Sequence, residues 1–312
     1  MTRHPDHALD HRTGSARPSY LGAARAQTIA PAALAWVAHT RAPRGLHIFD
    51  RACNLINERG EVVSIVAPEL GNGPFNIVVT DPYPAFVRGI NAAVPIVIDR
   101  ERLTVAGASI DLHDAQIWSP RPNWQALHQD RTEISSRLIE IQEWLLARAK
   151  PDSLLSAPLD ALSLGTVPTH HLQSCILPLC AAVANADLES SRAISSQVAG
   201  VGAGLTPAGD DLILGAVYAA WTIHLADRAR ALAEGMADAA CPRTNSISSA
   251  WLRAASRGEA GIVWHDVLHA LVAADMSVLL GYMEKLLAVG HTSGADALAG
   301  FVGSLMFLAR GV

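Results

Sequence analysis

A glycine-rich segment followed by two adjacent acidic residues has the clearest potential for chemistry in this sequence. The segment spans residues 200–211 and ends in Asp210 and Asp211. Its four glycines are Gly200, Gly202, Gly204 and Gly209. Glycines at alternate positions let successive backbone N–H groups turn toward one anion, and a helix that begins directly afterwards adds its free amides and its dipole. We therefore expect this segment to bind a phosphate or a carboxylate.

The same segment also has a simpler explanation. Thr206 can cap the following helix, Pro207 suits a first helical turn, and acidic residues complement the dipole at a helix start. A flexible loop needs fewer than four glycines, however, and capping does not account for two adjacent acids. We favour the anion site, with Thr206 as the cap. A dinucleotide-binding fingerprint is disfavoured, because residues 188–199 before the glycines look helical rather than strand-like.

A second segment repeats the residue order of the first. The order Gly-x-Asp-x-[Ile/Leu]-x-Gly occurs at 209–215 and again at 294–300, each time after a threonine. In both copies the Asp lies four residues before the final glycine, so the two share one helix face, and the glycine lets another helix approach closely. We expect the helix starts Thr206–Asp211 and Thr292–Asp296 to converge on one pocket. The alternative is two independently capped helices.

This shared pocket brings carboxylates together. The candidate catalytic residues are Asp210, Asp211 and Asp296. The candidate substrate- or phosphate-binding residues around them are Gly202, Gly204, Thr206, Gly209, His291, Thr292, Ser293 and Gly294. Neighbouring carboxylates repel one another, so the pocket should contain a metal, a cationic side chain or a carboxyl group with a raised pKa. We also expect Asp211 to be accessible to solvent.

A third segment, Gly-Asn-Gly-Pro-Phe-Asn at 71–76, is either a hairpin turn or a substrate loop. Glycine and asparagine suit turns with positive φ. As a substrate loop, it offers the amide groups of Asn72 and Asn76 to a carboxylate or carbamoyl group. In that case, the strand-rich part of the chain should close the pocket and bring both asparagines near it.

Two further clusters are better explained by structure than by ligand binding. The segment 244–249 places four hydroxyls and an amide ahead of a helix, which slightly favours capping. His265 and His269 have the spacing of a zinc-binding helix, but Asp266 replaces the general-base Glu of such sites. No zinc site is expected there.

The composition narrows the class of protein. The chain has 312 residues, of which 50% are hydrophobic and 17% charged, so it can bury a sizeable core without disulfides. A Lys+Arg count of 24 against 29 for Asp+Glu, with 5% aromatic residues, gives no support for nucleic-acid binding. The cysteines are scattered, the N-terminus lacks an apolar stretch, and no apolar run reaches the roughly 20 residues of a membrane span. These features predict a soluble, cytoplasmic protein.

The predicted fold class is α+β, with a β-rich domain followed by a mostly helical domain. Residues 1–22 are expected to form a mobile tail, and Ala23–Ala38 a short helix interrupted at Pro31. Within 23–122, short β-branched runs between turn residues predict an antiparallel sheet or small barrel. These runs are 51–57, 61–67, 75–80, 95–99, 103–106, 109–113 and 115–118. Within 123–312, apolar residues at helical spacing predict helices to the end, including one at Asp210–Ala233.

Together these segments resemble the AllH family. The resemblance rests on residues 71–76, on Leu-Thr-Pro-Ala-Gly-Asp-Asp at 205–211, on Ser248–Gly258, and on Gly-His-Thr-Ser-Gly-Ala-Asp at 290–296. It covers most of the chain after about residue 20. The segments at 205–211 and 290–296 are the more specific ones.

The resemblance implies a subunit of oxamate carbamoyltransferase that acts with FdrA-type and AllG-type partners in anaerobic allantoin breakdown, a branch of purine catabolism. The implied reaction interconverts oxalurate plus phosphate with oxamate plus carbamoyl phosphate. Such transfer needs a phosphate cradle, donors for the developing oxyanion and groups that orient the acceptor amine. The glycine-rich helix starts suit the first two needs. Asp210, Asp211 or Asp296 can orient the amine, act as a base or hold Mg²⁺.

Two other hypotheses stay open. In one, the chain is a hydrolase or phosphotransferase that uses Asp210, Asp211 and Asp296 as ligands of Mg²⁺. In the other, it is a non-catalytic assembly subunit whose polar loops face a partner protein. Mg²⁺ is the only cofactor that any of these hypotheses requires.

Overall fold

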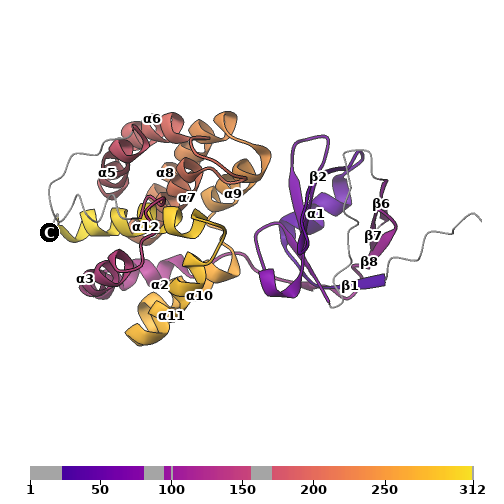
Figure 1. Ribbon diagram of the computed structural model, residues 1–312, viewed down its shortest axis with the longest axis horizontal. Coiled ribbons are helices and arrows are strands. Elements are labelled where there is room, and N and C mark those ends of the chain that lie inside the picture. The colour runs from indigo at the N-terminus through magenta and orange to yellow at the C-terminus, as the bar shows by residue number, and fades with distance from the viewer. Residues whose placement is uncertain (1–22, 81–94, 100, 156–170, 311–312) are drawn as a thin grey trace, which may run out of the picture.

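The structure is a computed structural model of the chain and describes residues 23–80, 95–99, 101–155 and 171–310 (Figure 1). The predicted tail at 1–22 lies outside these residues. The fold is α+β, as expected, with a strand-rich N-terminal part followed by a C-terminal part of helices. The two parts occupy opposite ends of the molecule in Figure 1.

The N-terminal part is a nearly closed, barrel-like sheet. Its strands are β1 (Ala23–Ile29), β2 (Arg44–Ile48), β3 (Ala52–Ile56), β4 (Val62–Val66), β5 (Asn76–Val79), β6 (Ile96–Asp99), β7 (Arg102–Val105), β8 (Ala108–Asp111) and β9 (Gln116–Ile117). They follow the order β2-β3-β4-β5-β1-β8-β7-β6, and β9 pairs with β1. Every strand-like run named from the sequence overlaps one of them. The β3–β4 hairpin turns at Gly60, whose φ of 76° suits glycine.

The sheet is mixed rather than antiparallel throughout. The β2–β3–β4 and β6–β7–β8 ladders are antiparallel, and so is the β1–β5 pair. The pairs β4–β5, β1–β8 and β1–β9 are parallel. Two of these parallel pairs involve β1, which is first in the chain but lies between β5 and β8.

The prediction for Ala23–Ala38 is wrong in its first half. The segment forms strand β1 and then helix α1 (Pro31–His39), so Pro31 begins a helix instead of interrupting one. Ala24 and Ala26 are buried in the sheet, and β1 is paired along both edges. Pairing with distant strands overrides the local preference of alanine for helix, which is a weak one.

The C-terminal part contains the remaining helices. They are α2 (Trp124–Gln129), α3 (Arg131–Leu146), α5 (His171–Ala184), α6 (Leu188–Val198), α7 (Ala208–Ile223), α8 (Ala226–Ala240), α9 (Ser246–Ser256), α10 (Ile262–Ala273), α11 (Met276–Leu287) and α12 (Ser293–Arg310). The single helix expected at Asp210–Ala233 is in fact two helices. His224 and Leu225 have extended backbone between α7 and α8, while the apolar spacing continues across them and hides the break.

The centre of the helical part is the contact between α7 and α12. A Cβ atom on Gly215 would lie 1.8 Å from the carbonyl oxygen of Ala297, and one on Gly300 would lie 2.1 Å from that of Leu212. Only glycine permits this backbone-to-backbone packing. The close approach expected from the repeated Gly-x-Asp-x-[Ile/Leu]-x-Gly order is therefore confirmed. The C-terminal end of α12 lies at the end of the molecule farthest from the sheet (Figure 1).

Helix α9 and the start of α10 contact the sheet. Ile247 of α9 packs in one apolar cluster with the sheet residues Ile56, Val62 and Phe75. The backbone amide of Ile262 at the start of α10 donates to the carbonyl oxygen of Asn72 over 2.9 Å. These contacts connect the strand-rich part directly to the helices around α7.

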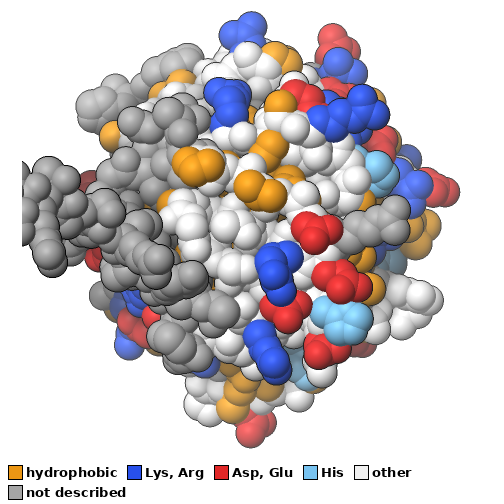
Figure 2. All heavy atoms as spheres, turned by 90° about the vertical axis from the view of Figure 1, so that its right-hand side faces the viewer, with side chains coloured by type: hydrophobic (Ala, Val, Ile, Leu, Met, Phe, Trp, Pro, Cys, Tyr) orange, Lys and Arg blue, Asp and Glu red, His pale blue; other side chains and the backbone are white. Residues whose placement is uncertain are grey.

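The surface shows no segregation of charge at the sheet end of the molecule. In Figure 2, acidic and basic side chains are interspersed wherever the described residues are visible. Within residues 23–80, 95–99, 101–155 and 171–310, no helix is long and apolar enough to cross a membrane. All four cysteines are buried and free.

Candidate functional site

The glycine-rich loop before α7 is exposed, and three of its glycines have positive φ. Residues 200–205 are all exposed. Gly200, Gly202 and Gly204 have φ values of 74°, 125° and 99°, which other residues rarely adopt. The backbone amides of residues 202–206 donate to no other residue in the described part of the chain. Successive free amides of this kind form a concave site for an oxyanion.

Asp210 supports this loop. One carboxylate oxygen, Oδ1, accepts a hydrogen bond of 2.8 Å from the amide of Gly200, and the other accepts one from the hydroxyl of Thr244. The side-chain amide of Asn245 donates to the carbonyl oxygen of Leu205 over 2.9 Å. Asp210 is buried, and both of its oxygens are occupied within the protein. Its visible role is therefore to fix the shape of the loop.

Thr206 does not cap α7, contrary to the sequence-based expectation. The helix begins at Ala208, and Pro207 occupies the cap position without a side-chain hydrogen bond. The Thr206 hydroxyl lies 2.8 Å from the hydroxyl of Ser293, the first residue of α12. The two helix starts therefore meet, as the repeated residue order predicted. Thr206 is at this contact because α7 and α12 are packed backbone to backbone below it.

The start of α12 also presents free amides. The backbone N–H groups of His291, Thr292 and Ser293 donate to no residue in the described segments. His291 is exposed, and its Nε2 lies 2.7 Å from Oδ2 of Asp152. The ammonium group of Lys150 donates to the carbonyl oxygen of His291 over 2.7 Å. A cationic group therefore lies beside this helix start, as a site for anions requires.

Below the hydroxyl pair lie two buried carboxyl groups. Asp211 is 6% exposed and Asp296 is 0% exposed, so the expectation that Asp211 is accessible to solvent is wrong. Oδ1 of Asp296 accepts a 2.6 Å hydrogen bond from the amide of Leu154. The Oδ2 atoms of Asp211 and Asp296 have no hydrogen-bond partner. A buried carboxylate oxygen that accepts no hydrogen bond costs free energy. The carboxyl groups of Asp211 and Asp296 therefore favour the protonated form.

Burial raises the pKa of Asp211 from 3.8 to about 8. Hydrogen bonds from the hydroxyls of Ser293 and Thr206 lower this pKa, with Ser293 the stronger of the two. The negative charges of Asp296 and Asp210 raise it, with Asp296 the stronger. Burial also raises the pKa of Asp296, against the opposing effects of the Leu154 amide and the Thr292 hydroxyl. The expected carboxyl group with a raised pKa is therefore present where the two helix starts meet. At neutral pH, Asp211 is largely protonated.

Gly209 and Gly294 have a packing function. A Cβ atom on Gly209 would lie 1.9 Å from the carbonyl oxygen of Val198, and one on Gly294 would lie 1.7 Å from that of Leu286. The amide of Gly209 is already bonded to the carbonyl oxygen of Val201. These contacts hold α7 and α12 against the preceding helices, so direct binding of substrate by these glycines stays a prediction.

Asn72 and Asn76 have partners elsewhere. The Asn72 side-chain oxygen accepts a hydrogen bond from the Thr28 hydroxyl, and the Asn76 side-chain amide donates to the carbonyl oxygen of Gly71 over 3.1 Å. Among the residues the structure describes, neither asparagine forms a hydrogen bond with α7 or α12. Their role in a substrate loop stays a prediction.

Sequence reasoning missed three contributors to the site. Thr244 and Asn245 were expected to cap a helix or to bind a polar ligand, with capping slightly favoured, and Asn245 does cap α9 by accepting from the amides of Ile247 and Ser248. Their second role, bracing the glycine-rich loop, has no local signal in the sequence. The same is true of Leu154, whose amide reaches Asp296 from 142 positions away.

The donor set does not fit a divalent cation. The described residues contain no group of three or more His, Cys, Asp or Glu that could hold a metal ion. Asp210 uses both oxygens inside the protein, which leaves one free oxygen each on Asp211 and Asp296. His265 has its Nε2 3.1 Å from the carbonyl oxygen of Pro120.

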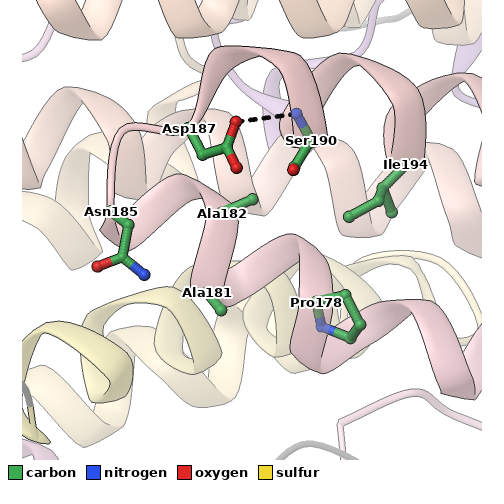
Figure 3. Close-up of a pocket in the computed structure, with 7 residues that line it drawn as sticks. All are labelled: Pro178, Ala181, Ala182, Asn185, Asp187, Ser190 and Ile194. Atoms are coloured by element: carbon green, nitrogen blue, oxygen red, sulfur yellow. Dashed lines mark hydrogen bonds between the residues drawn. The ribbon is translucent and has the colours of Figure 1, made fainter.

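Two surface cavities lie away from the helix starts. One of about 270 Å³ lies between α5 and α6, where Asp187 accepts from the amide of Ser190 and so caps α6 (Figure 3). The other, of about 450 Å³, is lined mainly by α2 and α10 and includes Arg121, His265 and His269. Neither is lined by residues of the loops at 200–206 and 290–293.

Two family models match this chain. The model described as oxamate carbamoyltransferase subunit AllH matches residues 198–305, and that of the AllH family N-terminal domain matches residues 42–117. The chain belongs to the AllH family. No solved structure matches it. The AllH match begins just before the glycine-rich loop and includes both helix starts.

Proposed function

We propose that the chain is the AllH subunit of a cytoplasmic carbamoyltransferase that interconverts oxalurate plus phosphate with oxamate plus carbamoyl phosphate in allantoin breakdown. Membership of a family named for oxamate carbamoyltransferase supports the reaction class. The observation that supports a role for this subunit in binding substrate is the contact between Thr206 and Ser293, which joins two sets of free amides.

The reaction makes defined demands on a site. In the direction of phosphorolysis, a phosphate oxygen bonds to the carbamoyl carbon of oxalurate, and the bond from that carbon to the oxamate nitrogen breaks. The proton of hydrogen phosphate ends on that nitrogen. The site must therefore hold a phosphate, stabilise an oxyanion and pass a proton between oxygen and nitrogen.

The pocket offers a group for each demand. The free amides at 202–206 and 291–293 suit the phosphate and the oxyanion, aided by the positive ends of two helix dipoles. Asp211 is largely protonated near neutral pH, and it lies below the Thr206–Ser293 hydroxyl pair. It is therefore suited to pass a proton through these hydroxyls to the leaving nitrogen and to regain one from the phosphate. Asp210 and Asp296 act indirectly, by shaping the loop and by keeping Asp211 protonated.

The proposed partners are FdrA-type and AllG-type subunits. Apolar side chains are exposed on the loops at both helix starts, at Val201, Leu205 and Val289. Exposed apolar groups around a polar site are typical of surfaces that a partner covers. A partner placed there would exclude water from the phosphate and add the groups that orient oxamate.

The experiment is to co-express the chain with FdrA-type and AllG-type subunits and to assay phosphate-dependent cleavage of oxalurate. We expect carbamoyl phosphate and oxamate in equal amounts. Cleavage that does not require phosphate would favour a hydrolase instead. Full activity of the partners without this chain would identify it as a non-catalytic assembly subunit.

A further inference from the structure

The two helix starts have a layered arrangement from the surface to the core. The free amides of residues 202–205 are at the surface. The hydroxyl-bearing residues Thr206 and Ser293 come next and are half-buried. Asp211 lies below them and is 6% exposed, with one oxygen lacking any partner. The protonation state of Asp211 can therefore set the direction in which the hydroxyl hydrogens above it point.

The number of hydrogen atoms that the hydroxyls and the carboxyl group carry decides whether one of them can be donated to an anion. Each hydroxyl has one hydrogen to donate, and a carboxylate has none. Both hydroxyls are hydrogen-bond partners of the Asp211 carboxyl group, and they also contact each other. If Asp211 is ionised, the two hydroxyl hydrogens point to the carboxylate or to the neighbouring hydroxyl, so no hydrogen points outward. If Asp211 is protonated, it donates to one hydroxyl, that hydroxyl donates to the second, and the second donates outward.

We infer that Asp211 is a positioning residue whose proton directs the Thr206–Ser293 hydroxyl pair outward, so that oxyanions bind at the neighbouring amides only while that proton is present. The inference rests on the anion site of the proposed function and adds the residue that regulates it. Protonation of Asp211 strengthens anion binding in two ways. It frees one hydroxyl hydrogen, and it removes a negative charge that would repel the anion.

The charges around Asp211 are consistent with this role. Asp296 on α12 and Asp210 on α7 act on it directly, and both are acidic. Behind Asp296 lies Asp152, which is paired with His291 at the surface.

The other helices packed on α7 bring their ionisable groups to different places. Cys180 of α5 faces Gly300, and His128 of α2 reaches the carbonyl oxygen of Ile223 at the far end of α7. Arg228 of α8 acts on His224, also at that end, and Arg253 of α9 acts on Cys241. The groups that shift the pKa of Asp211 are Ser293, Asp296, Thr206 and Asp210, and none of these helices contributes one of them.

The test measures sulfate binding to the purified full-length chain by isothermal titration calorimetry between pH 6.5 and pH 9.5. Sulfate stays a dianion throughout this range, so any change in affinity belongs to the protein. With the pKa of Asp211 at about 8, one required proton predicts affinity about 30-fold weaker at pH 9.5 than at pH 6.5. Sulfate affinity that does not change with pH, or no sulfate binding at pH 6.5, would overturn the inference.

Two variants identify the group responsible. Asp211→Asn replaces the acid by an amide that always donates, so its affinity should stay near the wild-type value of pH 6.5 at every pH. Ser293→Ala removes one hydroxyl from the chain of donors and should weaken binding at every pH. Asp187→Asn, a change at the α6 cap, is the matched control and should keep the wild-type pH dependence.

Wild-type pH dependence in Asp211→Asn would contradict the inference. The pH dependence of sulfate binding can also be measured whether or not the chain takes part in carbamoyl transfer. A complex that does not cleave oxalurate would end the proposed reaction, while a sulfate affinity governed by Asp211 would stand.

Discussion

The hydroxyl oxygens of Thr206 and Ser293 lie 2.8 Å apart, although the two residues are 87 positions apart in the sequence. Each stands at the start of one of two helices that are packed backbone to backbone. Above this contact lie two sets of free amides, and below it lie two buried carboxyl groups. This one contact therefore connects the surface of the proposed anion site with its buried acid.

Asp211→Asn should abolish most turnover of the reconstituted complex while the chain stays folded. An amide can still donate a hydrogen bond, but it cannot release a proton, and loss of general acid–base catalysis typically costs about 10²–10⁴-fold in rate. The measurement is the rate of phosphate-dependent oxalurate cleavage, with circular dichroism as the control for folding. Unchanged turnover would eliminate the proton-transfer role.

The same variant should change how stability depends on pH. The pKa of Asp211 is about 8 in the folded chain and near 3.8 when unfolded, so its contribution to stability is fully present below pH 3.8 and is lost as the pH rises to about 8. Wild-type stability should fall relative to Asp211→Asn by about 1.4 kcal/mol per pH unit in this window. Urea unfolding at pH 5, 6 and 7 measures the difference. Parallel stability curves for the two proteins would show that the pKa of Asp211 is not raised.

Gly300→Ala should destabilise the chain by at least about 2 kcal/mol, since a new methyl group would be forced against backbone atoms. Its Cβ would lie 2.1 Å from the carbonyl oxygen of Leu212, so the two helices would have to separate. Gly281→Ala on α11 is the matched control, because its Cβ would meet nothing within 4 Å. There, alanine should be neutral or stabilising by up to about 1 kcal/mol. Equal effects in the two variants would refute the close α7–α12 packing.

The isolated chain should be soluble and close to inactive. The match is to one subunit of a carbamoyltransferase, and the apolar side chains of Val201, Leu205 and Val289 are exposed around the proposed site. The measurement is oxalurate cleavage by the chain after purification under conditions that remove host proteins. Turnover equal to that of the reconstituted complex would show that no partner is required.

Local patterns were sufficient to predict much of the fold and the meeting of the helix starts. Short β-branched runs between turn residues identified β3 to β9. The β3–β4 and β6–β7–β8 ladders join strands that are neighbours in the chain, so their pairing follows from local turns. The repeated Gly-x-Asp order predicted the α7–α12 approach, because a glycine on a helix face lets another backbone come close.

Other features depend on partners that are distant in the sequence. Ala23–Ile29 is a strand because β5 and β8 lie on either side of it. Thr206 turns from the expected cap toward Ser293, and Asp211 is buried instead of accessible, because α12 covers α7. The supports from Thr244 and Leu154 could not be predicted for the same reason.

A crystal structure of the full chain grown with inorganic phosphate tests the central claim most directly. The account predicts one phosphate bound by amides of residues 202–206 and of residues 291–293 together, with the Thr206 or Ser293 hydroxyl donating to it. A phosphate that contacts only one of the two loops, or that binds elsewhere while both loops stay empty, would contradict a shared site.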